Sequence, residues 1–182
     1  MSIYPNCPQT IRKLKMGGFT KRQLMEELNR KAIHINALGE QLLSDERFTL
    51  SEHTYQLITV ELSVRDLGLT EGASLEQIFE TAEQLGLQIG PVEMGLYIRL
   101  AYLDQPEGSA GKPARTQRAP YGSITIATEI MDGSDEFPKG FYLRRINGEL
   151  WLRGYVADNE HIWDPDDRFV FCQSECKEMN MK

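Results

Sequence analysis

The chain has 182 residues, of which 41% are hydrophobic, and a formal net charge of −7 at pH 7. This apolar content is enough to build a core and excludes wholesale disorder. The acidic excess argues against general affinity for a polyanion, and the longest apolar runs are strand-sized, so we predict neither general nucleic-acid binding nor a membrane span.

The cysteine count and the first residues predict a cytoplasmic protein. Residues 1–10 lack the apolar core and small-residue cleavage site of a signal peptide. The three cysteines, Cys7, Cys172 and Cys176, are an odd number in a chain large enough to fold without disulfides. We therefore expect reduced thiols.

The first 53 residues divide into a leader and two helices. Pro5, Pro8 and the Gly17-Gly18 pair predict an irregular leader over 1–18. Thr20, with Gln23 three residues later, fits the capping box of a helix, and Asn36 can cap a second short helix. We predict a helical hairpin over 19–53.

Residues 54–182 are predicted to form the sheet. Hydrophobic residues alternate from Tyr55 to Arg65, which indicates a strand, and Ser74 opens a capped helix. Alternation over 96–102 predicts another strand. After a long connection over 104–122 come further strand patterns, among them 141–146 and 149–156 on either side of Asn147-Gly148, the strongest signal for a tight hairpin.

These elements predict one compact α+β domain. It begins with the N-terminal helical hairpin, which is followed by a mostly antiparallel sheet of about six strands with one principal helix on one face.

Several catalytic and metal-binding motifs are incomplete. The segment 106–113 contains Gly-Lys but lacks the first glycine and the hydroxyl residue of a phosphate-binding loop, and Ser109 is not in a Gly-x-Ser-x-Gly elbow. Cys172 and Cys176 form one loose pair, which Cys7 or His34 could extend to a zinc site. The acidic clusters 132–136 and 164–167 lack the full calcium-loop pattern and are typical of turns. We predict no metal and no cofactor.

The 149–156 strand is the strongest candidate for a binding surface. Trp151 and Tyr155 alternate with Leu150 and Leu152, and three arginines lie nearby, namely Arg144, Arg145 and Arg153. Aromatic residues mixed with arginines are frequent anchors of protein interfaces. The alternative is that Trp151 packs under the helix and Leu150 faces outwards, because both sides of this strand are apolar enough to be buried.

Three hypotheses of function remain open. The first is a noncatalytic binding or accessory module that engages a protein partner through the hairpin face and the 104–122 loop, where Asp104 and Glu107 lie. The second is an enzyme whose carboxylates and arginines meet in a cleft: Asp104, Glu107, Arg99, Asp164 and Asp166.

The third hypothesis is a nucleic-acid accessory protein that acts through its basic leader. Residues 1–35 hold seven basic and two acidic side chains. A basic helix docked on an acidic body is the alternative explanation of this asymmetry. The second predicted helix exposes Glu40 and Gln41, which are poorly suited to a phosphate-lined groove. The oligomeric state is left open.

Three segments, 74–86, 100–108 and 163–171, resemble a small family of uncharacterised bacterial proteins. The resemblance covers most of the chain. It implies no particular activity, cofactor or partner, so it adds no functional residue.

Overall fold

The computed structural model describes residues 10–108 and 119–173, which form an α+β fold with four α-helices and an eight-stranded sheet. The strands are β1 (Thr10–Met16), β2 (His34–Ile35), β3 (Tyr55–Ser63), β4 (Leu87–Gln88), β5 (Ile124–Ile126), β6 (Gly140–Ile146), β7 (Glu149–Tyr155) and β8 (Arg168–Gln173). The helices are α1 (Lys21–Arg30), α2 (Ala37–Ser44), α3 (Leu75–Gln84) and α4 (Met94–Ala101), with a 3-10 turn η1 at Arg65–Leu67.

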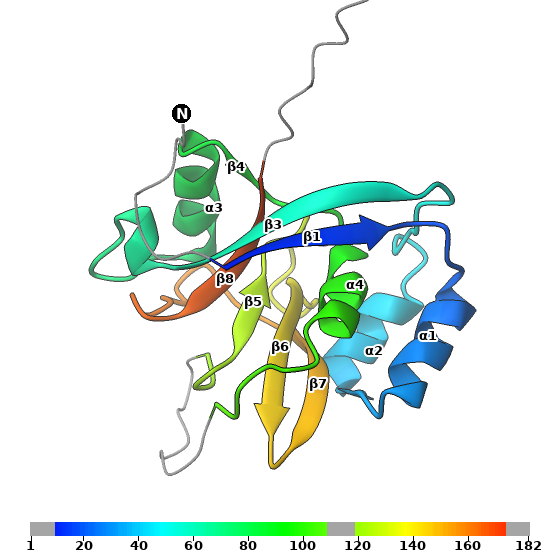
Figure 1. Ribbon diagram of the computed structural model, residues 1–182. Helices are drawn as coiled ribbons and strands as arrows, with labels where there is room; N and C mark the ends of the chain where they lie inside the picture. The colour runs from blue at the N-terminus through cyan, green and yellow to red at the C-terminus, as the bar shows by residue number, and fades with distance from the viewer. Residues whose placement is uncertain (1–9, 109–118, 174–182) are drawn as a thin grey trace, which may run out of the picture.

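The sheet is a strongly curled half-barrel with the strand order β1-β3-β8-β5-β6-β7-β2, and β4 pairs with β8 (Figure 1). Two neighbouring pairs, β5–β8 and β2–β7, are parallel, and the other pairs are antiparallel. The prediction of a mostly antiparallel sheet is therefore confirmed.

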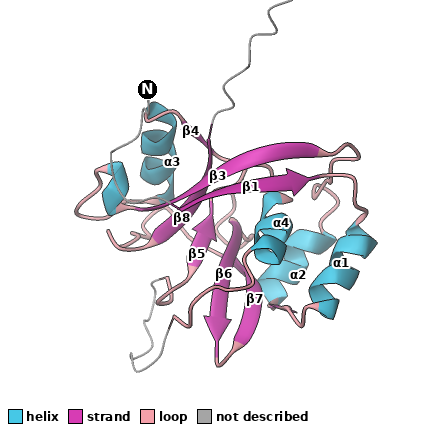
Figure 2. Cartoon of the chain, viewed as in Figure 1, coloured by secondary structure: helices cyan, strands magenta, loops and turns pink. Residues whose placement is uncertain are grey.

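Helices lie on both sides of this sheet, and we name its two faces after them. The inner face packs against α1, α2 and α4, whereas the outer face packs against α3, which lies beyond β3 and β8 (Figure 2). Each face has its own hydrophobic cluster, so the half-barrel separates two cores.

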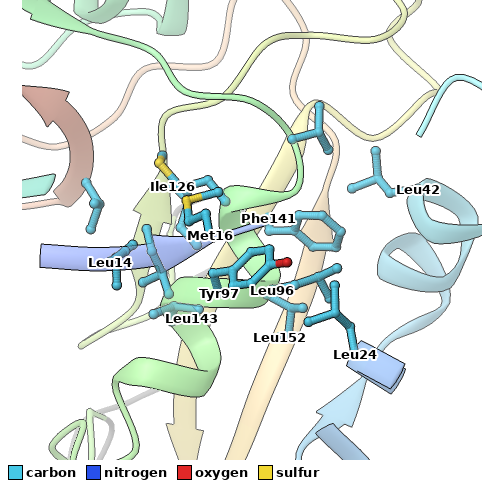
Figure 3. Packing of buried hydrophobic residues seen from close by; sticks show 14 of the residues in the cluster. Leu14, Met16, Leu24, Leu42, Leu96, Tyr97, Ile126, Phe141, Leu143 and Leu152 are labelled. Atoms are coloured by element: carbon cyan, nitrogen blue, oxygen red, sulfur yellow. The ribbon is translucent and has the colours of Figure 1, made fainter. Parts of the chain in front are cut away.

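The inner core is built around α4, whose residues from Met94 to Arg99 are all buried. Leu96 and Tyr97 of this helix lie among side chains from β1, β5, β6 and β7 (Figure 3). The helix approaches β6 closely at Gly95, where an added Cβ would lie 2.6 Å from the Phe141 ring. Gly95 therefore sets the distance between α4 and the sheet.

The capping and turn chemistry predicted from the sequence is confirmed. Both residues of the capping box are in place at α1 and at α3, and the Asn36 side chain accepts from the backbone N–H of Gly39 to cap α2. At the β6–β7 turn, Asn147 and Gly148 have φ values of 52° and 79°. A type I′ hairpin turn needs positive φ at these two positions.

The prediction of an N-terminal helical hairpin is wrong, because the described fold begins with β1. Thr10–Met16 lies within the predicted irregular leader, and residues 1–9 lie outside the described part. Leu14 and Met16 point into the inner core while Lys13 and Lys15 are exposed. This alternation has only two strong apolar positions, and pairing with β3 makes the segment a strand.

The two N-terminal helices exist but do not form a hairpin. β2 intervenes between them and pairs with β7, α1 packs on α4, and α2 packs on β7. The strand count exceeds the predicted six mainly because β2 and β4 have two residues each, too few for an alternating pattern.

Residues 96–102 do not form the predicted strand, because Met94–Ala101 is the helix α4. The helix lies inside the half-barrel and is buried on all sides, so its sequence lacks the one-sided stripe of a surface helix. Its buried polar residue, Arg99, also interrupts the apolar run. The alternation of Leu96, Ile98 and Leu100, which predicted a strand, therefore belongs to a helix that has no polar face.

Candidate functional site

The outward side of the β6–β7 hairpin carries most of the predicted binding residues. Leu143 pairs with Leu152 on the inner face, so their neighbours Tyr142, Arg144, Trp151, Arg153 and Tyr155 point outwards. We call these five residues the hairpin face. The helices that contact β6 and β7 are α2 and α4, and both lie on the inner side. Trp151 therefore does not pack under a helix.

Arg153 is held in place by two aromatic neighbours. Its Nε donates a hydrogen bond of 2.8 Å to the Tyr142 hydroxyl, and its guanidinium carbon lies 5.0 Å from the centre of the Trp151 ring. The Trp151 ring also contacts His34 of β2, with 4.8 Å between ring centroids. Ordered guanidinium groups lose less conformational entropy on binding a ligand.

The hairpin face has an unbalanced positive charge. Among the described residues, neither Arg144 nor Arg153 forms an ion pair, and the buried Nε of Arg144 has no hydrogen-bond partner. One carboxylate, Glu149, lies on the same outward side of β7 and is close to His34, with 3.7 Å between His34 Nε2 and Glu149 Oε1, so the two arginines still leave an excess of positive charge. The two arginines can therefore bind an anionic group from outside.

Arg145 and Glu107 do not belong to the hairpin face, because they fix the 102–108 segment to the hairpin turn. Arg145 Nη1 donates to the Gln105 carbonyl at 3.1 Å. The Glu107 carboxylate accepts from the backbone N–H groups of Asn147 and of Gly148, the latter at 3.1 Å. These contacts give both residues a structural role, and Asp104 beside them is exposed.

A buried polar network supports the hairpin from the inner side. Arg99 is fully buried, and its guanidinium donates to the Gln105 side chain at 2.7 Å, to the Trp151 carbonyl at 3.1 Å and to the Tyr102 carbonyl. Burial lowers the pKa of Arg99 to about 10, so it stays charged at neutral pH. Sequence reasoning missed Gln105, since a glutamine in a polar loop gives no pattern.

The structure does not bring together the five residues of the enzyme hypothesis. Arg99 is enclosed by backbone carbonyls and Gln105, whereas Asp166 pairs with Arg65 at 3.2 Å and the backbone N–H of Asp164 is bound by the buried Asp167 carboxylate. Nor do these residues line any of three prominent cavities in the described part of the chain.

A small aromatic pocket adjoins the hairpin face. Its volume is about 190 Å³, and its wall includes Ser123, Thr125, Tyr142, Tyr155, His161 and Trp163. The rings meet edge to face: Tyr155 and Trp163 lie 6.0 Å apart at 81°, and His161 and Trp163 lie 4.2 Å apart at 74°. Sequence reasoning predicted only Tyr155, because the other residues come from separate strands and loops.

Burial changes the acidity of two groups in this pocket. It raises the pKa of the Tyr155 hydroxyl and lowers the pKa of His161, although the negative charge of Asp158 partly opposes the second shift. Both groups are therefore mostly neutral at pH 7. A pocket with aromatic walls and neutral hydroxyl groups is chemically suited to an uncharged, planar group.

A larger cavity is an open groove of about 710 Å³ along α3. Glu76, Glu80 and Glu83 line one side of it, and Ile89 and Ile130 contribute apolar surface. The cation in the groove, Lys139, is buried and donates to the Ser134 carbonyl at 2.8 Å. The groove is therefore acidic, with charge opposite to that of the hairpin face.

The cysteines and acidic clusters considered as metal ligands have structural roles where the structure describes them. Cys172 is buried, its Sγ lies 3.3 Å from Met94 Sδ, and burial raises the pKa of its thiol to about 11. Cys7 and Cys176 lie outside the described residues. Within 10–108 and 119–173 no three His, Cys, Asp or Glu residues are grouped to hold a metal ion. Asp132 accepts from the backbone N–H of Ser134 at 2.8 Å, as a turn residue does.

One arginine of the predicted basic leader makes a contact within the fold. The Arg12 guanidinium lies 3.8 Å from the centre of the Tyr102 ring, whereas Lys13 and Lys15 are exposed on β1.

Comparison of the chain with protein-family models, with curated proteins and with solved structures finds no match. The resemblance to a bacterial family stays a prediction. None of the helices in the described part combines the length and apolar character needed to cross a bilayer. The fold and its site thus define an α+β half-barrel with an aromatic and arginine-bearing outer face.

Proposed function

We propose that this protein is a noncatalytic binding module that engages a protein partner through the hairpin face. The observation that carries the proposal is the outward grouping of Trp151, Arg153 and Arg144 on strands whose helices all lie on the other side. Tryptophan, tyrosine and arginine are the residues most enriched at the energetic centres of protein interfaces.

The order within this surface supports the same proposal. Arg153 is already fixed by Tyr142 and Trp151, and Trp151 is fixed by His34 on the neighbouring strand. Below the face, Arg99 binds the carbonyl of Trp151 and so holds the strand in position. A surface that needs little rearrangement keeps more of its contact energy for binding.

A protein partner accounts for the charge better than a nucleic acid does. The hairpin face offers two arginines without acidic partners, on a chain with a net charge of −7. Nucleic-acid binding rests on many lysine and arginine contacts to phosphates, which two guanidinium groups do not supply. Two arginines are sufficient for one or two carboxylates of a peptide.

The 104–122 connection borders the same surface. Its first part is fixed to the hairpin turn through Glu107 and to β6 through Gln105, and its last part lines the aromatic pocket at Ala119 and Pro120. Residues 109–118 lie outside the described part. The proposed interface includes the two described ends of the connection.

The test is capture of a partner by immobilised protein from the lysate of the source cells. The variant Trp151→Ala/Arg153→Ala should lose a specific partner that the unchanged protein retains. The matched control is Phe19→Ala/Arg22→Ala, which removes an exposed aromatic residue just before α1 and an exposed arginine on α1. Circular dichroism checks that both variants are folded. Equal capture by all three proteins would contradict the proposal.

A further inference from the structure

The aromatic pocket and the hairpin face are parts of one continuous surface. Tyr142 and Tyr155 belong to both, and the hydroxyl of Tyr142 accepts the hydrogen bond that orders Arg153. The inference below rests on the proposed function, because it names the chemistry of the partner segment that the hairpin face would bind.

The volume of the pocket limits what it can hold. Cofactors and drug-sized ligands occupy sites of roughly 300–1,000 Å³. The pocket here measures about 190 Å³, which is enough for a single side chain and too small for a nucleotide. This volume is suited to one side chain of a larger partner.

The wall chemistry favours an aromatic side chain over an aliphatic one. The Tyr155 ring already contacts Tyr142 and Trp163, with angles of 61° and 81° between the ring planes. A further ring can continue this edge-to-face arrangement, which a leucine or valine cannot. The Tyr155 hydroxyl forms no hydrogen bond with the described residues and can pair with the hydroxyl of an incoming tyrosine.

The neighbouring guanidinium group of Arg153 determines which second side chain of the partner segment binds beside the aromatic ring. Arg153 is the cross-strand partner of Tyr142 and lies two residues before Tyr155 on the same side of β7. Residues at this spacing in a strand are about 6.5–7 Å apart. An extended peptide has the same repeat, so a carboxylate two positions from the aromatic residue reaches Arg153 when the ring is in the pocket.

We propose that the partner presents an extended segment in which a tyrosine fills the aromatic pocket and a glutamate or aspartate two residues away binds Arg153. Arg144, on the adjacent strand, gives a second carboxylate a place to bind. The negative charge of the segment is opposite to that of the hairpin face. The acidic groove along α3 repels the segment, so binding to the hairpin face is favoured.

The experiment measures binding of synthetic peptides to the full chain by nuclear magnetic resonance. The probe is acetyl-Ala-Tyr-Ala-Glu-Ala-amide, and two comparison peptides replace the tyrosine with alanine or the glutamate with glutamine. We expect saturable shifts of the backbone signals of Thr125 and Tyr155. Affinity should fall at least fivefold with either comparison peptide.

Two protein variants separate the two contacts. In Arg153→Gln, the peptides with glutamate and glutamine should bind equally, while the preference for tyrosine over alanine stays. The matched control is Arg65→Gln, which removes an exposed arginine that does not line the pocket and should leave all affinities unchanged. Tyr142→Phe removes the hydroxyl that orders Arg153 and should give an intermediate loss.

Three outcomes would overturn the inference. One is equal affinity for all three peptides, and another is binding of free N-acetyl-tyrosine as tight as that of the probe, which would indicate a small-molecule site. The third is displacement of the probe by a single-stranded RNA oligonucleotide at equal concentration. If capture of the lysate partner depends on Trp151 and Arg153 but the peptides do not bind, the inference fails and the proposed function stands.

Discussion

The outer face of the sheet has a covered half and an open half. On β3 and β8, the outward residues Val60, Leu62, Phe169 and Phe171 are fully buried beneath α3 and Trp163. On β6 and β7, the outward residues include the hairpin face and have no helix above them. Both halves belong to one sheet, and in both the side chains alternate between the inner and the outer face. The difference in burial between the halves therefore depends on whether a helix covers them.

The size of α3 explains where the cover ends. A helix of ten residues is about 15 Å long and, with its side chains, about 10 Å wide, whereas neighbouring strands are about 4.8 Å apart. Such a helix covers two or three strands, and the apolar stripe of Leu75, Ile78 and Ala82 packs on β3 and β8. The strands beyond its reach carry arginine and aromatic side chains, which tolerate partial exposure.

The largest expected effect tests this comparison directly. Phe171→Ala should lower the free energy of unfolding by about 3–5 kcal/mol, because it leaves a cavity between β8 and α3. Trp151→Ala on the open half should lower it by about 1 kcal/mol or less, although it removes a larger side chain. Urea unfolding followed by circular dichroism measures both. Equal losses would show that Trp151 is part of a core.

The second prediction concerns the support beneath the open half. Arg99→Met should lower the free energy of unfolding by about 2–4 kcal/mol, because the carbonyls of Trp151 and Tyr102 lose their donor. The control Arg22→Met, at a highly exposed position of α1, should change stability by less than about 0.5 kcal/mol. If Arg99→Met is as stable as the control, the open half does not depend on this network.

The third prediction concerns the turn at the end of the open half. Glu107→Gln weakens the hydrogen bonds to the backbone N–H groups of Asn147 and Gly148 and should cost about 1–2 kcal/mol. Amide hydrogen exchange at these two residues should become faster, whereas exchange in β3 stays slow. Glu26→Gln on the exposed side of α1 is the matched control.

The smallest effect is expected at the border between the halves, where His161 contacts Trp163. Burial lowers the pKa of His161 below 6.5, so the folded state binds this proton less readily than the unfolded chain. The stability that depends on neutral His161 is therefore present above pH 6.5 and decreases as the pH falls through the folded pKa. Asp158→Asn should lower the pKa of His161 further, which a titration of its ring signals by nuclear magnetic resonance can measure. An increase would contradict this explanation.

The sequence showed the local features of the binding surface but not its neighbours. Asn147-Gly148 and the alternation around Trp151 were sufficient to predict the β6–β7 hairpin and its two sides. Whether a helix lay over Trp151 could not be decided, because both sides of the strand were apolar enough to be buried. The placement of α2 and α4 on the inner side decided it.

The aromatic pocket was beyond prediction for a related reason. Thr125, Tyr142, His161 and Trp163 come from β5, β6 and the segment before β8, and only the strand order places them together. The enzyme hypothesis placed Arg99 beside carboxylates in a cleft, whereas Arg99 binds carbonyl groups inside the half-barrel. The sequence does not indicate which polar group a buried arginine will meet.

By itself, the sequence determined the helix caps, the tight hairpin and the in-and-out pattern of the long strands, because each depends on residues within a few positions of one another. Only the tertiary structure decided that Thr10–Met16 is a paired strand, that residues 94–101 are helical inside the half-barrel, and that the outer side of β6 and β7 stays open. These depend on long-range packing, in which burial on all sides removes the periodicity that marks a helix and pairing turns a weak pattern into a strand.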